Sequence, residues 1–195
     1  AFAGIVITAS HNPPSYNGFK IKAHYGGPAI QNEIDEVESL IPESQEYEII
    51  PFDTLKENSL VEIIDMEQEY IDHVHANFDI DAIQKSGIKF GYDAMYGAGQ
   101  NVVRRLLPYC ELMHADYNPS FMGQAPEPIA RNLKPFADRI KNSDISCGLA
   151  TDGDADRIGL FDENGDFVDS HHIILLLIRY LVEFKGMKGN VYTSF

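Results

Sequence analysis

Residues 87–99 contain the pattern that decides the fold: Gly87-Ile88-Lys89-Phe90-Gly91-Tyr92-Asp93-Ala94-Met95-Tyr96-Gly97-Ala98-Gly99. The first seven residues predict a strand, and the glycine-rich end predicts a tight turn that leads into a helix. The alternation of strands and helices then continues at 102–107, 112–115, 133–141 and 147–150. Strand, helix, strand, helix, strand is typical of an α/β fold, so we predict mixed, mostly parallel sheets flanked by helices.

The segments on either side extend this pattern. Asn164-Gly165 separates the apolar runs 158–161 and 167–168, which predicts a β-hairpin. The apolar run 173–182 is about half of the roughly 20 residues that a membrane span needs, so it predicts a buried helix. Nearer the N-terminus we expect strands at 5–7, 18–22 and 46–50, and helices at 33–40 and 66–78.

Composition narrows the classes of function. The chain has 15 Lys and Arg against 30 Asp and Glu, a formal net charge of −15. This balance argues against an extended nucleic-acid surface and against binding to an anionic membrane. A small anionic substrate remains possible, because a metal or a few local cations can reverse the local field. Two cysteines, Cys110 and Cys147, are too few for a disulfide framework, so we expect buried thiols and a cytoplasmic location.

A cluster of carboxylates directly follows the strand 147–150. The loop reads Thr151-Asp152-Gly153-Asp154-Ala155-Asp156-Arg157, and its three aspartates can point to one side of an extended loop. Carboxylate oxygens suit Mg²⁺, especially beside a phosphate. Two alternatives stay open: an EF-hand, although Arg157 stands where the pattern needs glycine, and an acidic turn in solvent.

A second polar loop follows the first predicted strand. Thr8-Ala9-Ser10-His11-Asn12-Pro13 places a serine beside a histidine, which suggests nucleophilic chemistry. The GxSxG elbow of hydrolases is absent, adjacent residues in a strand-like loop tend to point apart, and a plain turn would also explain Ser, Asn and Pro. Gly97 and Gly99 match only part of a dinucleotide fingerprint, so we interpret them as a structural turn.

Taken together, these loops resemble the α-D-phosphohexomutases, the phosphoglucomutase and phosphomannomutase enzymes. The resemblance rests on Thr8-Ala9-Ser10-His11-Asn12-Pro13, on Asn17-Gly18-Phe19-Lys20 and on Asp152-Gly153-Asp154-Ala155-Asp156-Arg157. The segments 92–99 and 126–128 are similar to the family less specifically. The similarity covers nearly the whole chain, and the two main loops occur in the family's order.

The resemblance implies a mechanism and a set of roles. Ser10 would carry a phosphoryl group and exchange it with a hexose phosphate, through a bisphosphate such as glucose 1,6-bisphosphate, so that phosphate moves between positions 1 and 6. Lys20 would be the general acid and base, and Arg157 and His11 would steady the phosphoryl group. One Mg²⁺ would be held by a phosphate oxygen on Ser10 together with Asp152, Asp154 and Asp156.

The resemblance also implies a domain layout. Residues 1–67 would be the end of a first domain, 68–169 a second domain, and 170–195 the start of a third, so we expect a fragment of a longer enzyme that is inactive alone. Gly26-Gly27-Pro28-Ala29 favours a glucose-type substrate. Two other classes of protein stay open: a metal-dependent phosphatase in which Ser10 is structural, and a non-catalytic module that binds metal or sugar phosphate.

Overall fold

The computed structural model describes residues 2–44 and 48–192 and divides the chain into two compact units. The first unit comprises Ala1–Thr8 and Asn17–Phe78, and the second comprises Ala9–Tyr16 and Asp79–Phe195. The loop that contains Ser10 therefore belongs to the same unit as the carboxylate loop, although about 140 residues of chain separate the two loops. Lys20 lies in the other unit.

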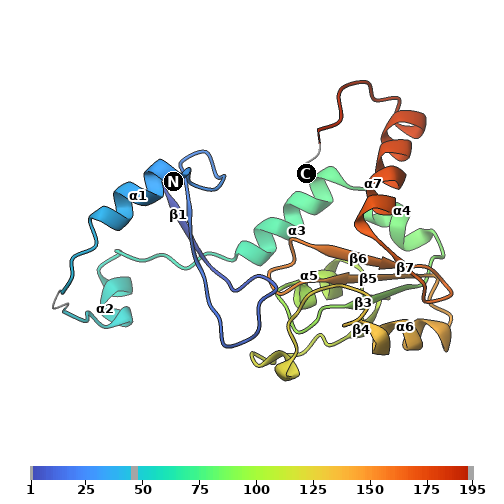
Figure 1. The fold of residues 1–195 in the computed structure, drawn as a ribbon, viewed down its shortest axis with the longest axis horizontal. Coiled ribbons are helices and arrows are strands. Elements are labelled where there is room, and N and C mark those ends of the chain that lie inside the picture. Colours follow the sequence, from blue (N-terminus) through green and yellow to red (C-terminus); the bar gives the residue numbers. More distant parts are fainter. Residues whose placement is uncertain (1, 45–47, 193–195) are drawn as a thin grey trace. The chain divides into compact units, whose positions relative to one another are not determined.

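The second unit is built on a five-stranded sheet (Figure 1). Its strands are β3 (Phe90–Asp93), β4 (Glu111–Met113), β5 (Cys147–Thr151), β6 (Ile158–Phe161) and β7 (Phe167–Val168), in the order β4-β3-β5-β6-β7. β3 pairs parallel with β4 and β5, whereas β6 pairs antiparallel with β5 and β7. Among the described strands of this sheet β6 alone runs in the opposite direction, so the predicted mixed, mostly parallel sheet is confirmed, as is the hairpin between β6 and β7.

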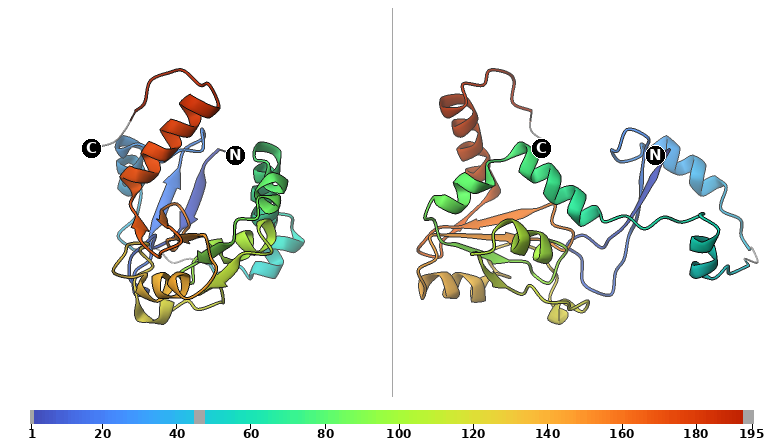
Figure 2. Two further views of the ribbon diagram at one scale, coloured as in Figure 1. Left: turned by 90° about the vertical axis from the view of Figure 1, so that its right-hand side faces the viewer. Right: turned by 180° about the vertical axis from the view of Figure 1, so that it is seen from behind.

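Helices cover both faces of this sheet (Figure 2). α6 (Lys134–Lys141) packs close to β5, because a Cβ at Gly148 would overlap Ile140 and lie 3.1 Å from the Phe136 ring. Successive strand residues point to opposite faces, and α5 (Gly99–Leu106) accordingly lies on the face of Tyr92, where a Cβ at Gly99 would overlap the Tyr92 hydroxyl. The sheet thus lies between two layers of helices, with α6 on one face and α5 on the other.

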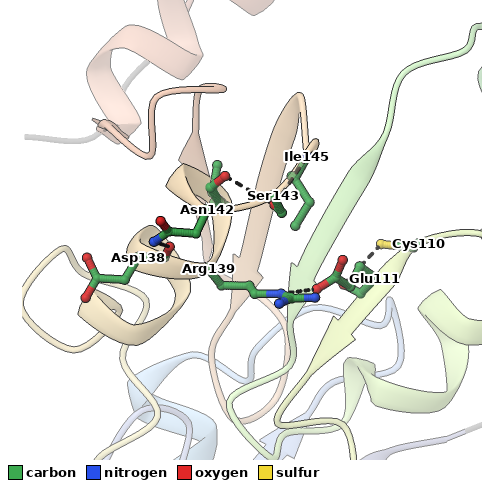
Figure 3. Close-up of polar contacts among 8 residues, drawn as sticks. Cys110, Glu111, Asp138, Arg139, Asn142, Ser143 and Ile145 are labelled. Carbon is green, nitrogen blue, oxygen red and sulfur yellow. Dashed lines mark hydrogen bonds and ion pairs between the residues drawn. The ribbon is translucent and has the colours of Figure 1, made fainter.

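The core of the second unit lies between the sheet and α6. Phe136 and Phe161 are almost fully buried and meet edge to face, with ring centroids 5.6 Å apart. The cluster consists of Met95, Leu133, Phe136, Ile140, Ile145, Ala150 and Phe161. Polar contacts at the rim fasten α6 to the sheet edge: the Arg139 guanidinium pairs with the Glu111 carboxylate of β4 (Figure 3). The apolar face of α6 is therefore packed directly against the sheet that contains β5.

The first unit is less compact. β1 (Gly4–Ile7) and β2 (Phe19–Lys22) form an antiparallel ribbon in which Ile5, Ile7 and Phe19 are more than half exposed. Three helices follow, α1 (Gln31–Ser39), α2 (Phe52–Glu57) and α3 (Met66–Asn77). The predicted strand at 46–50 is wrong at 48–50, which has no regular structure, and its first two residues lie outside the described residues. α2 was not predicted, because six residues are too few for a helical period to be recognised.

Two predictions about burial are wrong in the second unit. α7 (Ser170–Arg179) and the π-helical turn Tyr180–Phe184 form the predicted helix, but neither contains a buried residue. Leu175, Leu176 and Leu177 are each more than half exposed, because no described element packs against them closely enough to bury them. Cys110 and Cys147 are half-buried rather than buried. Burial and the neighbouring Glu111 charge raise the pKa of the Cys110 thiol to about 12.

No described helix has both the length and the apolar character required to cross a membrane.

α4 (Ile80–Lys85), a second short helix that was not predicted, depends on its N-cap. The Asp79 carboxylate accepts a hydrogen bond of 2.8 Å from the Ala82 amide. We expect Asp79→Ala to lower the free energy of unfolding by about 1 kcal/mol, because it leaves that amide without its acceptor. Urea unfolding measures the change. Asp81→Ala is the matched control: it removes a first-turn carboxylate of the same helix and its exposed ion pair to Lys85, and a loss as large as that of Asp79→Ala would contradict the prediction.

Candidate active site and metal centre

The carboxylate loop spans residues 152–157 and joins β5 to β6. Asp152 is fully buried, and its Oδ1 accepts hydrogen bonds of 3.0 Å from the amides of Asp156 and Arg157. The Ala155 amide donates to the Asp152 carbonyl, and Ala155 adopts a left-handed backbone with φ of 60°. These bonds curl the chain around Asp152, so its carboxylate sits inside the loop it organises.

The other two aspartates lie beside Asp152. One oxygen from each of Asp152, Asp154 and Asp156 lies within 4.8 Å of the others. Burial raises the pKa of Asp152, as do the charges of the two neighbours, while the amides of Arg157 and Asp156 act in the opposite direction. Three carboxylates this close repel one another unless a cation lies between them.

This geometry decides between the alternatives for the loop. An EF-hand would place a helix on each side, but the flanking elements are β5 and β6, so that alternative is excluded. A turn in solvent would leave all three carboxylates exposed, whereas Asp152 is fully buried and Asp154 Oδ1 is shielded from solvent, and of the three aspartates Asp156 alone is exposed. An all-oxygen set of this size and charge fits a hard divalent cation such as Mg²⁺.

The loop that contains Ser10 lies directly against this cluster. The Ser10 hydroxyl donates to Asp152 Oδ2 at 3.4 Å and lies 3.3 Å from His11 Nδ1. Adjacent residues were expected to point apart, but Ser10 has a left-handed backbone with φ of 54°, which turns the two side chains toward each other. The structure thus brings Ser10, His11 and Asp152 together.

The two loops also touch through their backbones. A Cβ at Gly153 would overlap the carbonyl oxygen of Ser10 and lie 3.1 Å from Pro126 Cγ. Only glycine allows the carboxylate loop to approach the serine loop this closely. The contact between the two loops therefore explains why a glycine lies between the first two aspartates, which the sequence of neither loop explains alone.

The remaining predicted residues differ in how they are placed. Arg157 is half-exposed, and its Nε lies 4.0 Å from Asp152 Oδ2, at the edge of the cluster. Lys20 is an exposed residue of β2, paired with Val6 in the first unit. Its role beside Ser10 stays a prediction.

The glycine-rich turn after β3 is a structural support for the carboxylate loop. The Ala98 amide donates to the Gly153 carbonyl at 3.0 Å, and a Cβ at Gly97 would lie 2.6 Å from the Asp152 carbonyl oxygen. This agrees with the interpretation of Gly97 and Gly99 as a structural turn.

Sequence reasoning missed a polar pair next to this turn. Asp93, which is 1% exposed, is a buried carboxylate at the end of β3, and His114 Nδ1 lies 3.0 Å from both of its oxygens. The hydrogen bond to Asp93 raises the pKa of His114, although partial burial opposes the shift. The two residues are 21 positions apart, and the parallel register of β3 with β4, which pairs Asp93 with Met113, brings them together.

This pair predicts a pH dependence of stability. Because the pKa of His114 is higher in the folded chain than in the unfolded chain, where it is about 6.5, protonation stabilises the fold. The stabilisation is complete below the unfolded pKa and is lost as the pH rises through the folded pKa. We expect the difference in melting temperature between the unmodified protein and His114→Gln to shrink from pH 6 to pH 9. A difference that stays constant over this range would contradict the prediction.

Fold and site together define a class: an α/β protein with a cluster of three carboxylates beside a serine hydroxyl. Two family models match the chain. Phosphoglucomutase/phosphomannomutase, alpha/beta/alpha domain II, covers residues 68–165, and alpha/beta/alpha domain I of the same family covers residues 1–48. The chain belongs to the phosphoglucomutase/phosphomannomutase family.

Individual relatives agree with this assignment. A probable phosphoglucosamine mutase of Methanopyrus kandleri is 31% identical over 188 residues, which is 94% of this chain and 40% of that protein. A phosphopentomutase of Thermococcus kodakarensis is 32% identical over 95% of this chain and 40% of its own length. The crystal structure of a putative phosphomannomutase from Thermus thermophilus superimposes with a TM-score of 0.81 at 30% identity, covering 95% of this chain and 42% of that one. The chain thus spans about two fifths of the length of the curated relatives it matches.

Proposed function

We propose that the chain is the part of a hexose phosphate mutase that carries the phosphoserine and binds the metal ion. The observation that carries this proposal is the position of the Ser10 hydroxyl, 3.4 Å from the buried Asp152 carboxylate in a cluster of three aspartates. A serine hydroxyl next to an oxygen-rich cation site is suited to carry a phosphoryl group. The family assignment and the names of the relatives as mutases support the same reaction class.

In the proposed reaction, phosphorylated Ser10 faces a hydroxyl of a sugar monophosphate. The bond between phosphorus and Ser10 Oγ breaks and its electron pair stays on Oγ, a bond from phosphorus to the sugar oxygen forms, and the sugar hydroxyl gives its proton to Lys20. The resulting bisphosphate returns its other phosphoryl group to Ser10, with Lys20 giving the proton back, so the net change is a 1-to-6 exchange. His11, 3.3 Å from Ser10 Oγ, and Arg157 would bind the phosphoryl oxygens.

The carboxylate loop would hold the cation. Asp152, Asp154 and Asp156 would ligate Mg²⁺ together with a phosphate oxygen on Ser10. When bound, Mg²⁺ would offset negative charge as the phosphoryl group leaves or rejoins Ser10. Asp152 also shapes the loop, because its Oδ1 accepts two backbone amides, so it would keep the other carboxylates in place.

Substrate identity is proposed from one segment. Gly26-Gly27-Pro28-Ala29 favours glucose phosphate and glucose 1,6-bisphosphate as the activating intermediate. Relatives are named for glucosamine and for pentose, and structural neighbours for mannose and glucose, so the family assignment does not select the sugar. We also propose that the ranges 1–67, 68–169 and 170–195 belong to three different domains. Residues 1–195 alone are proposed to lack appreciable mutase activity.

Coupled assays test this function. The full natural polypeptide that carries residues 1–195 is incubated with Mg²⁺ and a trace of glucose 1,6-bisphosphate. Glucose 1-phosphate, mannose 1-phosphate and glucosamine 1-phosphate are then compared as substrates. We expect isomerisation to the 6-phosphate, fastest with glucose. Release of inorganic phosphate without isomerisation would instead identify a phosphatase, and neither reaction would favour a binding module. Turnover by residues 1–195 alone would contradict the proposed inactivity of that segment.

A further inference from the structure

The turn between β3 and α5 contains two residues other than glycine in a strained, left-handed backbone. Met95 and Tyr96 have φ of 45° and 60°, and His114, which contacts the turn, has φ of 47°. Residues other than glycine rarely adopt this left-handed region, and they persist there only where the surroundings hold them. Contacts with neighbouring residues must therefore hold Met95 and Tyr96 in this conformation.

A buried carboxylate and its histidine partner fasten the turn. Asp93 Oδ1 accepts the Met95 amide at 2.8 Å, and both Asp93 oxygens lie 3.0 Å from His114 Nδ1. The Tyr96 amide donates to the His114 carbonyl at 2.8 Å, and the Tyr96 and His114 rings lie 4.9 Å apart. The amides of Met95 and Tyr96 are thus hydrogen-bonded to Asp93 and His114, respectively.

The other end of the turn contacts the carboxylate loop. A Cβ at Gly97 would lie 2.6 Å from the Asp152 carbonyl oxygen and 2.9 Å from that of Gly153. The Ala98 amide donates to the Gly153 carbonyl at 3.0 Å. The turn therefore packs directly against the backbone of Asp152 and Gly153.

We propose that Asp93 and His114 are positioning residues for the metal loop: they hold the strained turn at 94–97 against the carbonyls of Asp152 and Gly153 and so set the affinity of the loop for a divalent cation. This inference rests on the proposed function, because it assumes that the three aspartates bind the cation. The coupling runs through a continuous set of contacts from Asp93 to Asp152, which is the kind of network that transmits a small displacement.

Titration with Mn²⁺ tests the inference without using activity. Free Mn²⁺ is measured by electron paramagnetic resonance in the full natural polypeptide. We expect Asp93→Asn and His114→Ala to raise the Kd about tenfold, and His114→Gln, which keeps a hydrogen-bond donor, to raise it less. Asp162→Asn is the matched control: like Asp93 Oδ1, Asp162 Oδ1 accepts backbone amides of a turn, from Asn164 and Asp166 at 2.9 Å, but this turn lies at the far end of β6. Its Kd should stay unchanged.

Melting temperatures of the same variants separate positioning from simple stability. A purely structural pair would lower the melting temperature and leave the Kd unchanged at a temperature where every variant is folded, which would overturn the inference. If Asp93→Asn does not fold, the comparison of His114→Ala with His114→Gln decides. Failure of the unmodified protein to bind Mn²⁺ would contradict the proposed metal site and this inference together. Normal binding that is lost in Asp154→Asn but unaffected by the Asp93 and His114 substitutions would contradict this inference alone.

Discussion

Replacing Ser10 by alanine is expected to lower the mutase turnover of the full natural polypeptide by at least about a thousandfold, because it removes the oxygen that would accept the phosphoryl group. The Ser10 hydroxyl also contacts Asp152, at 3.4 Å, and His11, at 3.3 Å, so the variant loses both contacts in addition to the nucleophile. The coupled assay with glucose 1-phosphate measures the effect.

Ser15→Ala is the matched control for this substitution. Ser15 lies five positions further along the same loop and is exposed, so its removal tests whether any serine-to-alanine change in this loop is harmful. We expect its turnover to equal that of the unmodified protein. Substantial turnover in Ser10→Ala, with Ser15→Ala normal, would exclude Ser10 as the phosphoryl carrier and leave it a structural role.

The second large effect is expected for Gly153→Ala, although this substitution adds only one methyl group. The new Cβ would overlap the Ser10 carbonyl oxygen and lie 3.1 Å from Pro126 Cγ, so the carboxylate loop and the serine loop would have to move apart. A displacement of about 1 Å between reacting groups can cost about a hundredfold in rate, and we expect a loss of that order in kcat.

The control for Gly153→Ala is Gly189→Ala, because a Cβ at Gly189 would meet no atom within 4 Å. This variant should retain full turnover. Circular dichroism and thermal unfolding of both variants establish that the comparison is made between folded proteins. Unchanged kcat in Gly153→Ala would mean that the contact between the two loops has no part in the reaction.

The sequence predicted those parts of the fold whose residues carry local signals. β3 lies in the strand-like stretch 87–93 just before a glycine-rich turn, and β5 is a short apolar run followed by a polar loop. The Asn-Gly turn predicts the hairpin between β6 and β7. The three aspartates were recognisable because they alternate with Gly and Ala directly after a strand. Each of these features depends on neighbours within a few residues.

Features that depend on distant contacts were not predictable in this way. The run of leucines in α7 predicted a helix correctly, but apolar composition does not say which element packs against it, and the helix is exposed. The orientation of Ser10 toward His11 depends on the left-handed backbone of Ser10, which a serine at that position does not predict. The Asp93–His114 pair arises from the register of β3 and β4, which only the folded sheet defines.

The central claim is that Ser10 carries the phosphoryl group, and phosphopeptide mapping tests it most directly. The full natural polypeptide is incubated with Mg²⁺ and glucose 1,6-bisphosphate, digested, and analysed by mass spectrometry before and after addition of a sugar monophosphate. We predict phosphate on Ser10 that disappears when the sugar monophosphate is added. An unmodified Ser10, in protein shown to be folded and loaded with metal, would contradict the account.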